Sequence, residues 1–145
     1  MLADDDRTDA LLLHLTLKAA GVTNRVLHVA DGEAVLEYFK GEGRFSNRLT
    51  FPLPSILFLD LNMPRLGGYE VMEWLKKHPE FKPLIIALTA FNAFSEAEKI
   101  HQFGAHSFIV KPAKPQDIYN LIEAFPQYWD SIPMQDSSGT EIPVS

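Results

Sequence analysis

The chain has 145 residues, a net charge of −6 at neutral pH and no cysteine, and 46% of its residues are hydrophobic. This length can bury one core, the charge argues against broad nucleic-acid binding, and the missing cysteines exclude disulfides and thiolate metal sites. No apolar run is long enough to span a bilayer, and no basic region followed by an apolar stretch opens the chain. We therefore predict a cytoplasmic protein with no nucleic-acid or membrane partner.

The first half of the chain alternates apolar and helix-forming segments. In chain order we predict a strand at Met1–Ala3, a helix over 7–20, a strand at Arg25–Val29, a helix over 31–40 and a strand at Ser55–Leu59. Gly21 is a plausible end for the first helix, and Asp31 is a typical cap for the second. The run at Ser55–Leu59 is nearly all apolar, which is typical of a strand covered on both faces.

The second half continues the same alternation. We predict a helix at Tyr69–His78, a strand at Leu84–Leu88, a helix at Ser95–Phe103, a strand at Ser107–Val110 and a helix from Pro115 to about Trp129. Pro79 ends the first of these helices and Pro115 opens the last. Five strand–helix units with short apolar strands predict an α/β fold in which helices cover both faces of a parallel sheet. We assign residues 1–130 to this domain and 131–145, which are polar and non-periodic, to a flexible tail.

Polar residues follow four of the five predicted strands. Asp4 and Asp5 follow the first strand, Asp60 the third, Thr89 the fourth and Lys111 the fifth. Ligand sites in open parallel sheets lie beyond the carboxyl ends of the strands. Three carboxylates, a hydroxyl and an ammonium are therefore expected to converge on one edge of the sheet.

This set of residues is suited to phosphoryl transfer. Three carboxylates in one cleft need a cation, and oxygen ligands without histidine or cysteine favour Mg²⁺ or Mn²⁺. Lys111 supplies a fixed positive charge and Thr89 a hydroxyl donor, and a carboxylate nucleophile beside them is suited to accept a phosphoryl group. The chain contains no phosphate-binding glycine motif of a nucleotide site, which makes another protein or a small phosphorylated molecule the expected donor.

Four short segments, each at the end of a separate predicted strand, carry a family resemblance. They are Ala3–Asp6, Leu59–Pro64 with Gly67 and Gly68, Leu88–Ala90, and Val110–Pro112. Each is weak alone, but all four in this order resemble the receiver domain of two-component response regulators, over roughly residues 1–129. The resemblance implies a flavodoxin-like fold with five parallel strands in the order 2-1-3-4-5.

The resemblance also implies roles for individual residues. It implies Asp60 as phosphoacceptor, Asp4, Asp5 and Asp60 as metal ligands helped by the Asn62 backbone carbonyl, Thr89 and Lys111 as phosphoryl-binding residues, and a cis peptide bond before Pro112. Phe108 lies where receivers often carry an aromatic residue that moves inward on activation. A core strand residue is an equally good interpretation of Phe108. We expect Asp6 to cap the first helix instead of binding metal.

The resemblance implies a sensor histidine kinase as partner, in a phosphorelay whose output is protein–protein contact. The DGEA opening of the second helix, the long 41–54 loop and the GAHSFIVKP segment resemble stand-alone receivers that serve phytochrome-type kinases. Receivers of this family dimerise or bind targets through the face formed by the fourth helix, fifth strand and fifth helix. Candidates for apolar contacts there are Phe91, Phe94, Phe103 and Tyr119.

The strongest rival interpretation is a phosphatase of the haloacid dehalogenase class. Such enzymes also use an aspartate after an apolar strand, but they need a second aspartate two residues later as general acid and base. That position is Asn62, which cannot transfer a proton, so we predict a switch with at most slow, Mg²⁺-dependent self-dephosphorylation. Phe91, two residues beyond Thr89, is bulkier than the polar residue of many receivers and is expected to alter water access. A degenerate binding module and a transcription factor are weaker alternatives.

The first strand is unusually short for the centre of a sheet. Only Met1–Ala3 precede the acids, and three residues would leave the neighbouring strands partly unpaired. Either further residues upstream complete this strand, or the strand is short and the domain has low stability.

Overall fold

The computed structural model describes residues 1–90, 95–129, 134–135 and 141–142. Within them a parallel sheet of five strands has the order β2-β1-β3-β4-β5, which confirms the predicted fold class. The strands are β1 (Leu2–Ala3), β2 (His28–Val29), β3 (Ile56–Asp60), β4 (Leu84–Thr89) and β5 (Ser107–Val110). Every residue of β3 and β4 is buried, as their apolar sequences predict.

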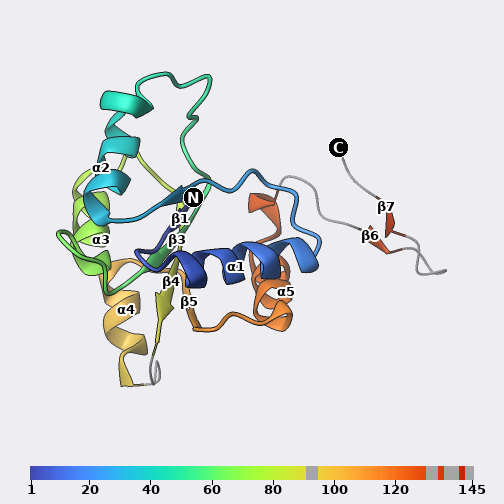
Figure 1. The fold of residues 1–145 in the computed structure, drawn as a ribbon. Helices are drawn as coiled ribbons and strands as arrows, with labels where there is room; N and C mark the ends of the chain where they lie inside the picture. The colour runs from blue at the N-terminus through green and yellow to red at the C-terminus, as the bar shows by residue number, and fades with distance from the viewer. Residues whose placement is uncertain (91–94, 130–133, 136–140, 143–145) are drawn as a thin grey trace.

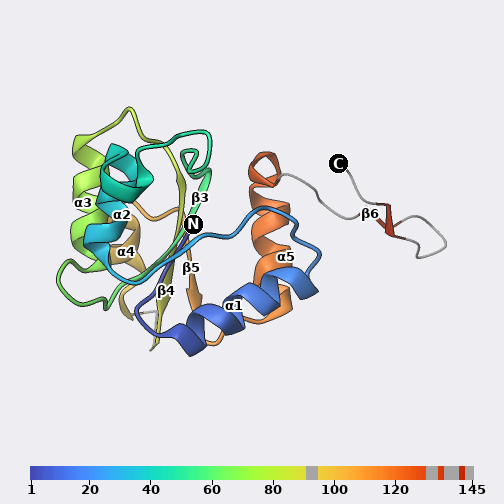
Figure 2. The same ribbon diagram turned by 45° about the horizontal axis from the view of Figure 1, so that its top comes forward.

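Helices cover both faces of this sheet. They are α1 (Arg7–Ala19), α2 (Gly32–Lys40), α3 (Gly68–Lys77), α4 (Ala97–Phe103) and α5 (Pro115–Ala124), with short 3-10 turns η1 (Gly43–Phe45) and η3 (Pro126–Tyr128). Figure 1 and Figure 2 show α1 and α5 side by side on one face and α2, α3 and α4 on the other. Each face has its own apolar cluster, so the sheet separates two halves of the core.

Local sequence explains where most helices begin and end. The Asp6 side chain accepts hydrogen bonds from the backbone N–H groups of Thr8 (2.8 Å) and Asp9 (3.1 Å), which confirms its predicted role as the cap of α1. Asp31 caps α2 in the same way. The last helix ends at Ala124, not near Trp129 as predicted. Pro126 explains the difference, because it disfavours helical geometry at the residue before it and lacks an N–H.

The second strand is also shorter than predicted. Of Arg25–Val29 only His28 and Val29 pair with β1, because β1 itself has two residues in strand geometry. One further bond joins the strands, from the Leu2 N–H to the Leu27 carbonyl at 2.8 Å. The Arg25 side chain instead donates to the Thr50 carbonyl at 2.6 Å and helps to hold the long 41–54 loop.

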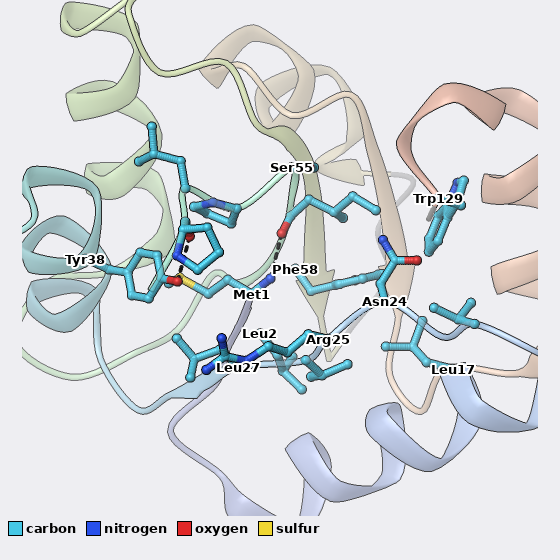
Figure 3. Close-up of a pocket in the computed structure, with 16 residues that line it drawn as sticks. Met1, Leu2, Leu17, Asn24, Arg25, Leu27, Tyr38, Ser55, Phe58 and Trp129 are labelled. Atoms are coloured by element: carbon cyan, nitrogen blue, oxygen red, sulfur yellow. Dashed lines mark hydrogen bonds between the residues drawn. The ribbon is translucent and has the colours of Figure 1, made fainter. Parts of the chain in front are cut away.

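The short β1 leaves space at the amino end of the sheet. Met1 is held there by its amino group, which donates to the Ile56 carbonyl at 2.7 Å, and by its carbonyl, which accepts from the Phe58 N–H at 2.9 Å. A cavity of about 170 Å³ lies beside it, between Leu17, Trp129 and neighbouring side chains (Figure 3). This cavity is at the opposite edge of the sheet from the carboxylates that follow β1 and β3.

The helix α1 buries only some of its leucines. Leu13 and Leu17 pack into the core, whereas Leu11, Leu12 and Leu15 are exposed. The exposed side chains form a stripe along the outer surface of α1, since positions four apart lie on the same side of a helix.

The C-terminal segment is described only in part. Residues of β6 (Met134–Gln135) and β7 (Glu141–Ile142) pair antiparallel. The predicted boundary at residue 130 and the rest of the predicted flexible tail lie outside the described residues. Among the helices that the structure describes, none combines the length and the hydropathy that a membrane span requires.

Candidate functional site

The structure brings three carboxylates together at the carboxyl edge of the sheet. Asp4 and Asp5 directly follow β1, and Asp60 is the last residue of β3. Each of the three offers an oxygen atom that lies within 4.8 Å of the other two. Asp4 is 1% exposed and Asp60 5%, while Asp5 faces solvent. Since β1 and β3 are neighbours in the sheet, their carboxyl ends bring all three carboxylates together.

Lys111 is the counter-ion of this cluster. Its Nζ lies 2.8 Å from Asp4 Oδ2 and 3.2 Å from Asp60 Oδ2. The lysine directly follows β5, and its backbone N–H donates to the Thr89 carbonyl at 2.7 Å. The Lys111–Pro112 peptide bond is cis, the isomer that the family resemblance implies.

Burial and charge shift the titration of these groups. Burial raises the pKa of the Asp4 carboxyl, and the Lys111 ammonium offsets only part of this rise. For Lys111 burial alone would lower the pKa, but the hydrogen bond to Asp4 and the charges of Asp60 and Asp4 raise it above the usual range of a lysine. A lysine with a raised pKa stays charged at neutral pH, so the cluster keeps one fixed positive charge.

The donor set fits a hard divalent cation. Asp4 Oδ2 is buried, and its charged neighbour is Lys111 Nζ at 2.8 Å. One ammonium leaves the three clustered carboxylates with excess negative charge, and carboxylate oxygens are the ligands that Mg²⁺ and Mn²⁺ prefer. The Asn62 N–H donates to Asp60 Oδ1 at 3.2 Å and orients that carboxylate. The Asn62 carbonyl as a metal ligand stays a prediction.

The two predicted switch residues lie on neighbouring strands. Thr89 ends β4 and is buried, at the same edge of the sheet as Asp60. Phe108 in β5 lies opposite Ala87 and packs, half-buried, against the core cluster shared with α3 and α4. This position fits both a core role and a switch role. Phe91 and Phe94 lie outside the described residues.

Asp9 contacts the site and was not predicted from the sequence. It lies in the first turn of α1, and its Oδ2 accepts a hydrogen bond from Lys111 Nζ at 3.2 Å. An acid in the first turn of a helix is common because it favours the positive end of the helix dipole. The sequence gives no signal for its contact with Lys111, because Asp9 lies inside α1 and not at a strand end.

The segment after Asp60 contains Gly67 and Gly68, and only at Gly68 is there no room for a side chain. A Cβ on Gly68 would lie 2.5 Å from the Asp60 carbonyl oxygen, whereas the nearest atom to a Cβ on Gly67 would be 3.5 Å away. Gly68→Ala is therefore expected to lower the free energy of unfolding by about 1–3 kcal/mol and to displace the end of β3. Gly67→Ala is the matched control, with an expected loss below about 1 kcal/mol. Urea unfolding measures both, and equal losses would contradict this packing.

The chain as a whole is similar to several known proteins. The family model described as "Response regulator receiver domain" matches residues 1–123. Response regulator Rcp1 of Synechocystis sp. is 25% identical over 133 residues, covering 89% of this chain and 86% of that protein. The solved structure of the bacteriophytochrome response regulator RtBRR matches with a TM-score of 0.79 and 25% identity, covering 95% of this chain and 83% of that one. A response regulator in red light signaling of R. palustris matches with a TM-score of 0.74 and 28% identity, covering 99% and 97%.

Proposed function

This chain belongs to the response regulator receiver domain family, which acts in phosphorelay signalling, and we propose that its phosphoacceptor is Asp60. Histidine kinases phosphorylate the receivers of this family. The observation that carries the assignment is the contact of Asp60 Oδ2 with Lys111 Nζ at 3.2 Å, in a cluster with Asp4 and Asp5. Asp4 has an equivalent pair of contacts, with Lys111 and the Asp6 N–H, so the choice of Asp60 follows its position as the last residue of β3, which the family resemblance implies.

The cation of the site is proposed to be Mg²⁺, with Mn²⁺ as a substitute. Asp4, Asp5 and Asp60 would hold it, and when bound it supplies positive charge that neutralises the phosphoryl oxygens. Without a cation, the cluster carries three negative charges against the single positive charge of Lys111. The excess negative charge would repel an incoming phosphoryl group, so we expect uptake to depend on a divalent cation.

The proposed reaction is a direct phosphoryl transfer. One carboxylate oxygen of Asp60 forms a bond to phosphorus as the bond between phosphorus and the nitrogen of the donor histidine breaks, and the electron pair of that bond stays on the histidine. Lys111 lies next to Asp60 and would balance charge on the transferred group. Thr89, at the end of the next strand, would donate its hydroxyl to a phosphoryl oxygen.

Phosphorylation is proposed to change the face formed by α4, β5 and α5. The phosphoryl group adds negative charge and strong acceptor oxygens, which would draw Thr89 towards Asp60. Phe108 would then fill the vacated space, a shift between two packings of the same core. Tyr119 on α5 and Val110 on β5 are exposed and are available for a second copy or a target. Phe103 instead packs against Tyr69, with ring centroids 4.8 Å apart.

A phytochrome-class sensor kinase is the proposed partner. The support is the likeness to receivers whose names place them with phytochromes. The exposed Leu11, Leu12 and Leu15 of α1 offer an apolar surface for such a partner, on the same helix whose first turn contacts Lys111 through Asp9. The cytoplasmic location stays a prediction from the sequence.

The experiment that tests this function follows the fate of a small phosphodonor, such as acetyl phosphate, in the presence of Mg²⁺. A switch takes up about one phosphoryl group per chain and then stops, apart from slow self-dephosphorylation. Steady turnover of a generic phosphomonoester would favour a phosphatase instead, and no uptake at all would contradict both functions. Omitting Mg²⁺ is the control, and it is expected to abolish uptake.

A further inference from the structure

Lys111 has three carboxylate partners, and one of them lies outside the acidic cluster. Its Nζ contacts Asp4 at 2.8 Å, Asp60 at 3.2 Å and Asp9 at 3.2 Å. Asp4 and Asp60 also belong to the three-carboxylate cluster that can hold a cation, together with Asp5. Asp9 lies outside that cluster, on the helix that begins after it. The three partners of Lys111 therefore differ in what a bound cation would do to them.

A cation at the cluster competes with Lys111 for the same carboxylates. Asp4 Oδ2 and Asp60 Oδ2 are the atoms that face the ammonium, and both residues would be ligands of the cation. Two positive groups on the same carboxylates repel each other, so binding of the cation weakens the hold of Asp4 and Asp60 on Lys111. The contact with Asp9 would be the one that cation binding leaves intact.

We propose that Asp9 is a positioning residue, which keeps the Lys111 ammonium at the site when a divalent cation occupies Asp4 and Asp60. This inference rests on the proposed function, because it concerns how Lys111 reaches the phosphoryl group. Asp9 itself touches neither the cation cluster nor the transferred group. Its effect on phosphoryl transfer is exerted through Lys111 alone.

The surroundings of Asp9 suit this role. Its side chain is 39% exposed while that of Lys111 is 16% exposed, so Asp9 keeps part of its hydration while it contacts a more buried partner. A cavity of about 20 Å³, lined by Asp9, Lys111 and Leu12 among others, lies beside the pair and is large enough for one water molecule. A water molecule there would solvate the ammonium where its contact with Asp4 weakens.

The test is a double-mutant cycle at saturating Mg²⁺, with phosphoryl uptake from acetyl phosphate as the first readout. Asp9→Asn is expected to slow uptake about threefold, the scale of a half-exposed ion pair. In a Lys111→Met background the same change is expected to have no effect, because the residue that Asp9 positions is gone. Glu70→Gln, which removes an exposed acid from the first turn of α3, is the matched control and should leave the rate unchanged.

A second readout needs no phosphoryl transfer. The side-chain ammonium signal of Lys111 in ¹H–¹⁵N spectra is expected to persist in the wild type when Mg²⁺ is added and to broaden or disappear in Asp9→Asn. Wild-type uptake with no change in either readout for Asp9→Asn would overturn the inference, as would equal slowing in the Lys111→Met background. If the wild type takes up no phosphoryl group, the proposed function fails, and the ammonium signal alone decides whether Asp9 holds Lys111.

Discussion

Replacing Lys111 by methionine is expected to lower the free energy of unfolding by about 3–5 kcal/mol at neutral pH without divalent cations, the usual cost of removing one partner of a buried ion pair. Methionine keeps much of the side-chain volume and removes only the charge. Asp4 and Asp60 are almost fully buried, and Lys111 Nζ is within 3.2 Å of both. Without the ammonium, these carboxylates would be left in the protein with no positive charge beside them.

The loss of stability in Lys111→Met should be smaller at acidic pH and in the presence of Mg²⁺. In the wild type the raised pKa of Lys111 gives stability that is fully present below the ordinary pKa of a lysine and is lost only as pH rises through the folded-state value. In Lys111→Met, the Asp4 carboxyl, whose pKa burial raises, gains a proton as pH falls, so the deficit should shrink in acid. Adding Mg²⁺ should also shrink it, because a cation replaces the missing charge.

Urea unfolding at neutral and acidic pH, with and without Mg²⁺, measures this prediction. Lys77→Met is the control, because Lys77 is an exposed lysine in the last turn of α3 and its replacement should change stability little. A Lys111→Met protein as stable as the wild type in the presence of a chelator would show that Lys111 does not neutralise the cluster.

Asp4→Asn is expected to have opposite effects on stability and on cation binding. Affinity for Mg²⁺ should fall about 100-fold, at the upper end of what the loss of a supporting residue costs a metal site, because Asp4 is proposed as a direct ligand. The cation-free protein should instead become more stable by about 1 kcal/mol, because burial makes the ionised Asp4 carboxylate a net cost while Lys111 keeps Asp60 and Asp9 as partners. The Asp6 N–H can still donate to the amide oxygen of the asparagine, as it now does to Asp4 Oδ1 at 2.9 Å.

The pH dependence of this gain follows from the raised pKa of Asp4. A carboxyl whose pKa is raised in the folded state adds stability below its unfolded pKa and loses it as pH rises through the folded value. At neutral pH the ionised Asp4 is therefore a cost, so Asp4→Asn should be most stabilising at neutral pH and least stabilising in acid. Titration calorimetry measures the affinity for Mg²⁺, and thermal unfolding measures the stability of the cation-free protein.

Asp6→Asn is the matched control for this prediction. It removes one charge from the same acidic segment, while asparagine caps a helix about as well as aspartate. Affinity and stability should both stay close to the wild-type values. If Asp4→Asn and Asp6→Asn weaken Mg²⁺ binding equally, the effect is one of general charge and Asp4 is not a ligand.

The fold could be predicted from the sequence wherever a local pattern determines the structure. The apolar runs of β3 and β4 and the caps Asp6 and Asp31 are such patterns, and the structure confirms them. The length of β2 could not be predicted in this way, because it depends on how many residues of β1 are there to pair. Neither could the exposure of Leu11 on α1, since leucine content alone does not say which side of a helix meets the core.

Some residues of the candidate site could likewise be predicted from the sequence, and one could not. Asp4, Asp60 and Lys111 were found because each comes at the end of a predicted strand, and strand ends in a parallel sheet meet at one edge. Asp9 was missed because it lies inside a helix, where its contact with Lys111 depends on how α1 packs beside the strand that ends before Lys111. A rule based on strand ends cannot identify a residue that reaches the site from a helix.

Intact mass spectrometry of the wild type and of Asp60→Asn, each incubated with acetyl phosphate and Mg²⁺, tests the assignment of Asp60 most directly. The wild type is predicted to gain the mass of one phosphoryl group, with the modification located in the peptide that contains Asp60, and Asp60→Asn to gain none. A wild-type protein that gains no phosphoryl group, or an Asp60→Asn protein that gains as much as the wild type, would contradict it.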